Sequence, residues 1–419
     1  MNLGYACLAL GVPDTKMRTC RLDNATLEHL KTLSERNLHA LEVIVKYNVE
    51  NSIRLYRICS DLIPFGSHPA ASFAWQDIFR ERLLHIGQTI GDAHMRVSMH
   101  PGQYSVLNSM NPDVVSRCID DLVYHERVLS SLGMESKHKI VLHIGGVFGD
   151  KRRSLQRFHT HFAYLDDAVK KRLVIENDDR HFHIADVLET GHALGVPVVF
   201  DNLHHQINGC DSLSPSEWIA ACQQTWRGQD GAQKIHYSQQ DRTKRAGAHS
   251  QTIRVREFIS FCESLPDKQI DVMLEVKDKN LSVIKCALCL KGNGKISELE
   301  RQWSLYKYLV LEKNPSGYSG IRQMLKDKAS YPALGFFDII EASLYADENK
   351  GYAVNAAQHV WGYFKSVCTG LEKASFDKLM GDYALGHISF SRVKRFLFRL
   401  SVKYQINYLL NSYFFLEVL

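Results

Sequence analysis

The sequence predicts an α/β protein in which a (β/α)8 barrel of the TIM type spans residues 1–300 and an all-helical region spans 301–419. Short β-type runs alternate with amphipathic helical stretches through about the first 290 residues. The β-type runs are almost continuously apolar, as expected for parallel strands that are buried on both faces. Eight such units fit a closed barrel better than an open sheet.

The predicted strands and helices follow one another in a regular order. Asn111 and Ser214 each precede a proline at the start of the helical stretches 111–133 and 214–226, which is a common N-terminal helix signal. The predicted strands are 3–10, 62–67, 96–100, 139–146, 172–178, 196–202, 234–238 and 270–276.

The pattern changes after residue 300. The stretch "NPSGYSG" (314–320) is predicted to be a linker, and the remaining residues follow a helical period with many aromatic side chains, most clearly over 358–386. A separate helical domain over 301–419 is therefore expected.

Composition limits the class of protein. With 45% hydrophobic and 23% charged residues, the 419-residue chain is typical of a globular protein, and it has no apolar segment long enough to span a membrane. The ten cysteines lack the rhythm of a disulfide framework, which predicts the cytoplasm as the location. Cys286 and Cys289 have no second pair at zinc-ribbon spacing and are expected to be inert helix residues.

The formal net charge of +5 is mild, but basic residues cluster at 150–157 and 239–245. Both runs are expected in loops. They could bind phosphates or could simply form a solvated surface.

Side chains that commonly bind metals end the predicted strands. A single histidine at a strand end is usually only a hydrogen-bonded polar residue. Seven consecutive strand ends with this property would bring many imidazoles and carboxylates to one rim, at a high cost in desolvation and repulsion unless cations bind there. The set is His68, His100, His143, Glu176, Asp201 with His204, His236 and Glu275, together with His249 from the loop after the seventh strand.

The mixture of ligands narrows the choice of ion. Imidazole and carboxylate without thiolate suit Mn²⁺, Zn²⁺, Fe²⁺ or Co²⁺ better than Ca²⁺ or Mg²⁺. Nine ligands exceed the needs of one ion, so two or three ions are predicted, with Glu176 and Glu275 as candidate bridges. Ions about 3.5–4 Å apart favour displacement at phosphorus, because one activates water and another stabilises the leaving oxygen. The sequence therefore predicts a phosphodiesterase with an anionic substrate.

The barrel region resembles the UV damage endonucleases, DNA-repair enzymes with a barrel similar to that of endonuclease IV. The resemblance covers roughly residues 1–290 and rests on the ordered motifs "LGYACL", "SHP", "MHPGQY", "LHIGG", "IENDD", "FDNLHH", "KIHYSQQ", "GAHS" and "LEVKDKN". It implies ATP-independent incision of double-stranded DNA immediately 5′ of cyclobutane pyrimidine dimers and 6-4 photoproducts, and also at abasic sites. The implied ends are a 3′-hydroxyl and a 5′-phosphate. All nine candidate ligands match the family's metal positions, and manganese is the expected metal.

The resemblance also implies roles for individual side chains. Lys234, two residues before His236, matches a lysine that the family carboxylates; the residues alone leave a phosphate contact as an equal alternative. Gln103 and Tyr104 in "HPGQY" match residues that probe the duplex at the lesion, with loop packing as the alternative. Tyr5 matches a residue that lines the lesion pocket, and a buried core tyrosine is the alternative.

Recognition is expected to depend on deformability, because a photodimer cannot stack or pair normally and costs less to flip out of the duplex. Catalytic roles are expected for Glu176, Glu275, Lys234 and His236. Phosphate contacts are predicted for Arg152, Arg153, Lys244, Arg245 and Lys277.

The helical region weakly resembles a YbgA-like domain of unknown function through "HVWGYFK" and "LMGDYALGHISFSRVKRFL". This resemblance implies no chemistry, and we expect the region to mediate an interaction rather than catalysis.

Three other functions fit parts of the pattern. An abasic-site endonuclease of the endonuclease IV kind is distinguished by the Gln103–Tyr104 pair and by Lys234. A metal-dependent sugar isomerase would use carboxylates with few histidines and would need no basic rim. A non-catalytic DNA-binding or metal-holding module would leave the ring of ligands idle. Neither a nucleotide cofactor nor a membrane partner is expected.

Overall fold

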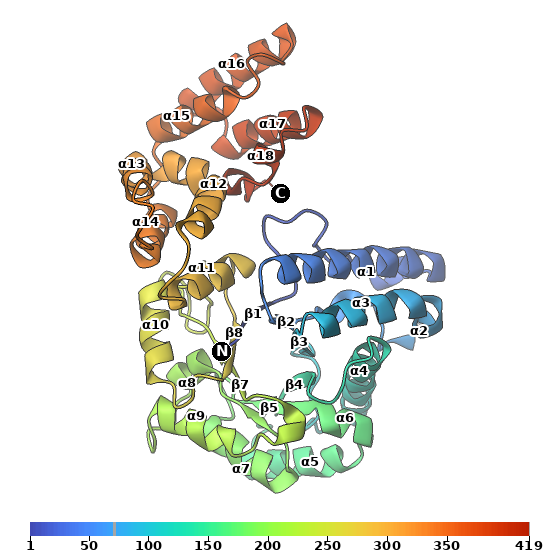
Figure 1. The fold of residues 1–419 in the computed structure, drawn as a ribbon. Helices are drawn as coiled ribbons and strands as arrows, with labels where there is room; N and C mark the ends of the chain where they lie inside the picture. Colours follow the sequence, from blue (N-terminus) through green and yellow to red (C-terminus); the bar gives the residue numbers. More distant parts are fainter. Residues whose placement is uncertain (70–72, 419) are drawn as a thin grey trace. The chain divides into compact units, whose positions relative to one another are not determined.

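The structure is a computed structural model that describes residues 1–69 and 73–418. These residues form two compact units, which are considered separately (Figure 1). The first unit comprises Met1–Ala9, Asp14–Ile253 and Ser260–Ile284, and the second comprises Leu10–Pro13, Arg254–Ile259 and Lys285–Leu419.

The first unit is built on eight parallel strands, as predicted. The strand order is β6-β5-β4-β3-β2-β1-β8-β7, and the isolated parallel bridge between Asp201 and His236 joins the two ends of this series into a barrel. Nearly every strand residue is buried, which agrees with a parallel sheet covered on both faces. The strands are β1 (Leu3–Ala6), β2 (Leu55–Arg57), β3 (Arg96–Met99), β4 (Lys139–His143), β5 (Leu173–Glu176), β6 (Val198–Val199), β7 (Lys234–Tyr237) and β8 (Asp271–Leu274).

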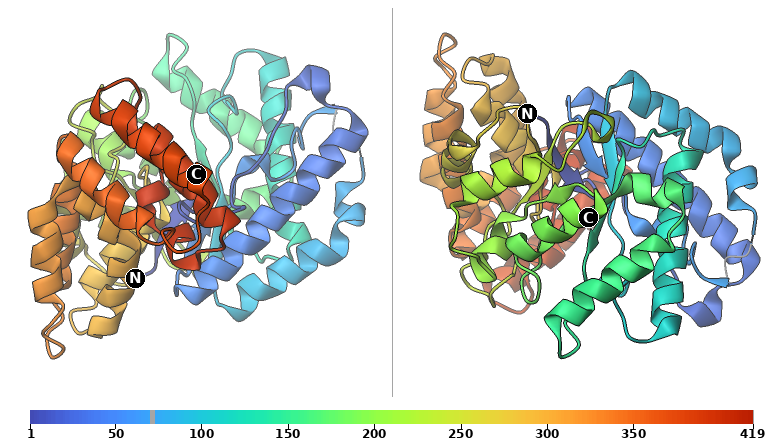
Figure 2. Two further views of the ribbon diagram at one scale, coloured as in Figure 1. Left: turned by 90° about the horizontal axis from the view of Figure 1, so that it is seen from above. Right: turned by 90° about the horizontal axis from the view of Figure 1, so that it is seen from below.

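Helices lie outside the strands in both views of Figure 2. The two predicted helix starts are confirmed: Asn111 accepts a hydrogen bond from the Asp113 amide, and Ser214 accepts one from the Glu217 amide. The helices are α1 (Leu27–Glu50), α2 (Trp75–Ile78), α3 (Arg80–Asp92), α4 (Pro112–Ser131), α5 (Lys151–Ala163), α6 (Asp167–Arg172), α7 (Ile184–Leu194), α8 (Asn202–Ile207), α9 (Pro215–Gln223), α10 (Val255–Ser264) and α11 (Asn280–Leu290).

The predicted second strand is wrong. Strand β2 lies at Leu55–Arg57, and residues 62–67 instead contain the end of a 3-10 helix followed by turns. Leu55 is fully buried and pairs with both Gly4 and Arg96, so these residues complete the sheet. Pro64 has no amide to donate to a ladder, and Phe65 adopts φ +59°, which a strand cannot accommodate.

Two expected loops are helical. The basic run 150–157 lies mostly in α5, which Asp150 caps by accepting from the Arg153 amide. The predicted linker 314–320 begins α13 (Pro315–Met324), with Asn314 as its cap. A Cβ atom on Gly317 would lie 2.7 Å from the Ile339 side chain, so this glycine permits close packing rather than chain flexibility.

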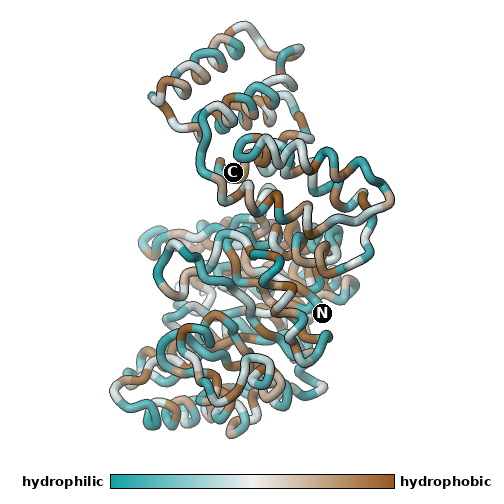
Figure 3. Tube along the Cα trace, turned by 90° about the vertical axis from the view of Figure 1, so that its left-hand side faces the viewer, coloured by the Kyte–Doolittle hydropathy of each residue, from teal (hydrophilic) through white to brown (hydrophobic). Residues whose placement is uncertain are grey.

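The second unit is all-helical, as predicted. Hydrophilic and hydrophobic residues alternate along its helices, as in amphipathic helices (Figure 3). Its core is aromatic, with the rings of Trp361 and Phe376 stacked 4.2 Å apart. The remaining helices are α12 (Ile296–Lys313), α14 (Ala333–Leu344), α15 (Lys350–Trp361), α16 (Gly370–Ala384), α17 (Phe390–Lys403) and α18 (Asn407–Leu410).

Two predictions from composition can be compared with the structure. All ten cysteines are free thiols, and Cys286 and Cys289 lie in α11 as expected. Among the described residues, no helix is both long enough and apolar enough to cross a membrane.

Candidate metal centre

The carboxyl ends of the barrel strands bring eight of the nine expected ligands together. Each of the eight has a side-chain atom within 4.0 Å of another member of the set. Because parallel strands end at one rim, ligands that are far apart in the chain converge there. The eight are His100, His143, Glu176, Asp201, His204, His236, His249 and Glu275.

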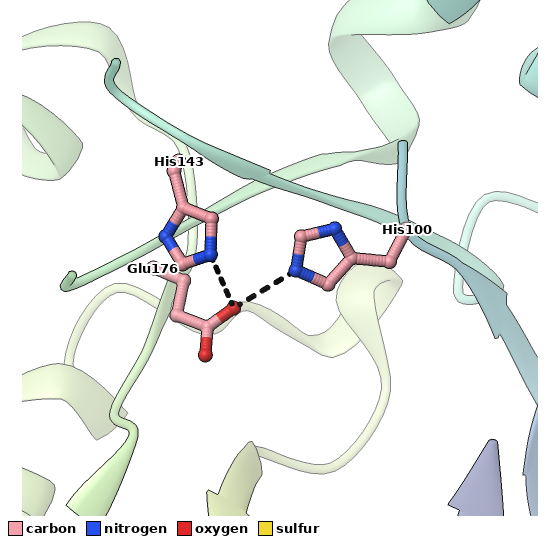
Figure 4. A group of neighbouring side chains, drawn as sticks. All are labelled: His100, His143 and Glu176. Carbon is pink, nitrogen blue, oxygen red and sulfur yellow. Dashed lines mark hydrogen bonds and ion pairs between the residues drawn. The ribbon is translucent and has the colours of Figure 1, made fainter. Parts of the chain in front are cut away.

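Glu176, the last residue of β5, lies at the centre of this set. Its Oε2 is 3.3 Å from His100 Nε2 and 3.7 Å from His143 Nε2, and both rings turn toward this oxygen in Figure 4. Its Oε1 is 2.7 Å from His236 Nδ1 and 3.8 Å from His204 Nδ1. Burial opposes ionisation, but the imidazoles of His236 and His143 lower the pKa of Glu176 well below its ordinary value.

The hydrogen bonds of His100 favour a role as a ligand. Its Nδ1 lies 3.0 Å from the Pro101 carbonyl oxygen and its Nε2 lies 3.3 Å from Glu176 Oε2, so the single proton of a neutral ring can satisfy only one of these two acceptors. Burial lowers the pKa of His100 to about 4, so the ring is neutral near pH 7. With the proton on Nδ1, the Nε2 atom and the carboxylate oxygen that faces it both offer electron pairs, and a cation between them would satisfy both.

Without a bound metal ion, the ring of His204 is protonated and supplies positive charge at the site. Its Nδ1 lies 2.9 Å from the Asn177 carbonyl oxygen and 3.8 Å from Glu176 Oε1. Burial opposes protonation, but Asp201 and Glu176 raise the pKa of His204 to about 9. The acidic surroundings therefore attract positive charge.

Asp201, the cap of α8, has a buried atom that requires a partner. Its Oδ1 accepts from the His204 amide at 2.7 Å, while its Oδ2 is buried and has no hydrogen-bond partner among the described residues. Such a group costs about 1–3 kcal/mol if it stays unsatisfied. Burial also raises the pKa of Asp201. A divalent cation would satisfy Oδ2.

Two asparagines that the sequence analysis did not identify hold the strand ends in place. Asn177 Oδ1 accepts from the Asp201 amide at 2.8 Å, and its Nδ2 donates to the Asp201 carbonyl at 3.1 Å. Asn202 makes the equivalent pair of bonds with the backbone of Ser238. The sequence contains a signal that could have identified both asparagines, because each directly follows an acidic candidate ligand, in Glu176–Asn177 and Asp201–Asn202.

Two overlapping groups have the compactness of a metal site. One is His100, His143 and Glu176, and the other is Glu176, Asp201 and His236; in each, the ligand atoms lie within 4.8 Å of one another. Only nitrogen and oxygen donors are present, which fits a divalent transition metal. Glu176 belongs to both groups, which suits it to bridge two ions.

Arg57, which the sequence analysis also missed, extends into the same rim. Its Nη2 donates to Glu275 Oε1 at 2.6 Å and to His236 Nε2 at 2.9 Å. Burial opposes ionisation of Glu275, but the guanidinium lowers the pKa of this carboxyl well below its ordinary value. A correctly placed second strand would have revealed Arg57 as a strand-end residue.

Two predicted site residues, His68 and Tyr5, are not part of the group of eight converging side chains. His68 is exposed, with its ring centroid 6.0 Å from that of Phe65, and its role as a ligand remains a prediction. Tyr5 is fully buried, and its hydroxyl donates to Asn48 Oδ1 at 2.8 Å. The structure agrees with the core-tyrosine alternative for Tyr5, and a role at the lesion remains a prediction.

Gln103 and Tyr104 form the exposed tip of the loop after β3, with Tyr104 68% exposed. Both ends of this loop are held. Ser105 donates to Asp121 Oδ2 at 2.5 Å, and the Pro101 carbonyl lies 3.0 Å from His100 Nδ1. The tip therefore projects into solvent from a fixed base beside a candidate ligand.

Lys234 begins β7 and is 1% exposed. Its side chain is on the same face of the strand as His236, two residues later. Burial, reinforced by Arg96 and Arg57, lowers the pKa of Lys234 well below its ordinary value. A neutral amine is expected at this position.

The residues predicted to bind phosphates are all exposed. Two of them have acidic neighbours: Arg153 lies 3.4 Å from Asp150, and Lys244 lies 3.3 Å from Asp241. The five are Arg152, Arg153, Lys244, Arg245 and Lys277.

Comparison with known proteins shows the families that the two parts of the chain match. Residues 1–304 match the family described as UV-endonuclease UvdE, and residues 307–417 match a protein family of unknown function, DUF1722. A UV DNA damage endonuclease from Clostridium perfringens is 36% identical over 386 residues, which cover 91% of this chain and 92% of that protein. A UV DNA damage endonuclease from Bacillus cereus strain Q1 is 29% identical over 282 residues, which cover 66% of this chain and 88% of that protein.

A solved structure shares the fold. The crystal structure of SacUVDE is 37% identical, with a TM-score of 0.66, and covers 70% of this chain and 98% of that chain. The family match covers residues 1–304, which is most of the chain. The barrel of this chain lies within that range and carries the convergent candidate ligands described above. The chain therefore belongs to the UV-endonuclease UvdE family.

Proposed function

We propose that this protein cuts damaged double-stranded DNA immediately 5′ of cyclobutane pyrimidine dimers and 6-4 photoproducts, and also at abasic sites, by metal-dependent hydrolysis without ATP. The observation that carries the proposal is the convergence of four imidazoles on the carboxylate of Glu176. The relatives from C. perfringens and B. cereus are named as UV DNA damage endonucleases, which supports damaged DNA as the substrate.

The proposed ligands of two or three divalent ions, preferably Mn²⁺, are the nine residues identified from the sequence. Bound ions supply the charge that lowers the pKa of water and stabilises the leaving oxygen. The protein orients the donors: Asn177 fixes the ring of His204, and the Pro101 carbonyl fixes that of His100. Arg57 lies beside Glu275 and His236 and adds a fixed positive charge at the rim.

Gln103 and Tyr104 are the proposed lesion probes. They are exposed on a loop whose ends are held by hydrogen bonds, so an inserted side chain would not need to order the whole loop. An aromatic ring can replace stacking that is lost when a dimer leaves the duplex, and a photodimer costs less to unstack than intact bases.

Carboxylation of Lys234 is proposed as part of the same centre. Burial favours the neutral amine, and that form adds to carbon dioxide, releasing a proton and leaving an anionic carbamate. A ¹³C-carbonyl signal that appears after incubation with ¹³C-bicarbonate, and that is absent from Lys234→Met, would support this. An identical signal in the variant would contradict it.

The test uses an end-labelled duplex that carries one cyclobutane dimer, with matched abasic and undamaged duplexes, Mn²⁺ and no ATP. We expect a cut immediately 5′ of the dimer that leaves a 3′-hydroxyl, a cut at the abasic site, and no cut in undamaged DNA. Cutting of the abasic duplex alone would instead favour an endonuclease IV-like function. No cut in any duplex would refute the proposal.

A further inference from the structure

The positive charge of this protein is unevenly distributed along the chain. Residues 1–284 contain 33 Lys and Arg against 34 Asp and Glu, whereas residues 285–419 contain 18 against 12. The formal charge is therefore −1 in the first part and +6 in the second. The excess lies in the helical region, to which the endonuclease chemistry assigns no role.

Much of this charge is on one helix. Helix α17 contains five Lys and Arg and no Asp or Glu. Arg392, Arg395 and Arg399 are exposed and follow the i, i+3, i+7 spacing of a single face. At 100° per residue this face lies directly opposite the buried face, which includes Val393 and Leu397. Packing of the apolar face therefore orients the arginines outward.

The three arginines have no acidic neighbours among the described residues. Within residues 73–418, no carboxylate oxygen lies within 4.0 Å of Arg392, Arg395 or Arg399. By contrast, Lys403, at the end of the same helix, lies 2.6 Å from Glu372. Three more exposed cations of this unit have acidic partners: Arg256 with Asp338, Lys291 with Glu298, and Lys328 with Glu300.

We infer that this arginine face, defined by Arg392, Arg395 and Arg399, is a docking surface for the phosphate backbone of duplex DNA. From Arg392 to Arg399 the helix rises about 10.5 Å, comparable to the axial rise of about three phosphates on one strand at 3.4 Å each. Guanidinium groups bind phosphate in a bidentate manner, and such contacts carry no sequence information, so the surface would hold damaged and undamaged DNA equally. The inference rests on the proposed function for the choice of polyanion.

Salt dependence provides a quantitative test. Each phosphate contact adds about 0.9 to the slope of log K against log salt, so three contacts contribute about 2.7. The full-length variant R392Q/R395Q/R399Q should bind undamaged duplex more weakly and show a slope smaller by about 2.7. The ratio of wild-type to variant affinity should then fall about 40-fold between 50 and 200 mM salt. Glutamine is a good helix former, so the exposed face should stay helical.

A matched control removes the same charge from the same unit. In R256Q/K291Q/K328Q each lost cation had an acidic partner, so the salt slope should stay close to that of wild type. The variant R392K/R395K/R399K should retain most of the slope, because it keeps the charges. Circular dichroism and melting temperature would establish that all variants are folded.

Several outcomes would overturn the inference. One is an R392Q/R395Q/R399Q variant with wild-type affinity and slope, and another is an equal loss of slope in the control variant. A variant that loses affinity only for anionic lipid vesicles, and not for duplex DNA, would assign the face to a membrane surface instead. Incision measured at a saturating concentration of R392Q/R395Q/R399Q distinguishes the proposed docking surface from the proposed endonuclease function. If wild type binds duplex through the three arginines but cuts no lesion, the proposed endonuclease function fails and the docking surface stands.

Discussion

Replacement of Glu176 by glutamine should separate metal binding from DNA binding. The change preserves shape but removes the charge that four imidazoles approach, the nearest at 2.7 Å. Glu176 belongs to both compact ligand groups, so both lose a donor at once. Loss of a residue that merely orients a metal ligand costs about 10–100-fold in metal affinity or activity, so loss of a shared ligand should exceed about 100-fold. Affinity for duplex DNA should stay within about twofold, because phosphate contacts come mainly from basic side chains.

The assay combines three readouts on the same preparation: Mn²⁺ binding by calorimetry, incision of the dimer duplex, and affinity for undamaged duplex. Glu135→Gln is the matched control, because it makes the same chemical change on a side chain that is 75% exposed and lies before β4. If Glu176→Gln bound Mn²⁺ with wild-type stoichiometry and cut at the wild-type rate, a central ligand role for Glu176 would be refuted.

Three further predictions concern lesion preference, the buried guanidinium and pH. Gln103→Ala with Tyr104→Ala should keep Mn²⁺ binding but lose preference for dimer over intact duplex; unchanged discrimination in competition assays would exclude a probing role. Arg57→Met should destabilise the metal-free protein by about 3–5 kcal/mol, because Glu275 then lacks its buried partner, and an unchanged urea midpoint would contradict this. The pKa of His204 in the folded protein, about 9, exceeds its value in the unfolded chain. Its contribution of about 3 kcal/mol to the free energy of unfolding should therefore be complete below pH 6.5 and lost as pH rises to 9. Urea melts of metal-free wild type and His204→Gln across this range should converge as pH rises, and parallel curves would refute the assignment.

Much of the architecture follows from local patterns in the chain. Apolar runs of strand length separated by amphipathic helices require a buried parallel sheet, and parallel strands bring their carboxyl ends to one rim. His143 and Glu176 could therefore be placed together from the sequence, although 33 positions separate them. The caps at Asn111 and Ser214 were equally predictable, because a cap depends only on residues within one turn.

The remaining features depend on contacts between distant parts of the chain. Strand β2 has only three residues and ends in an arginine, so its pattern is too short to identify until β1 and β3 pair with it. The ring of His204 is oriented by the Asn177 carbonyl, which lies 27 positions away in the chain and approaches only after folding. The sequence by itself determined that eight of the nine candidate ligands reach one rim, because the alternation of strands and helices and the residue at each strand end can be read locally. Only the tertiary structure decided that Arg57 joins them and that the Asn177 carbonyl orients the His204 ring, because hydrogen bonds between different strand ends set both.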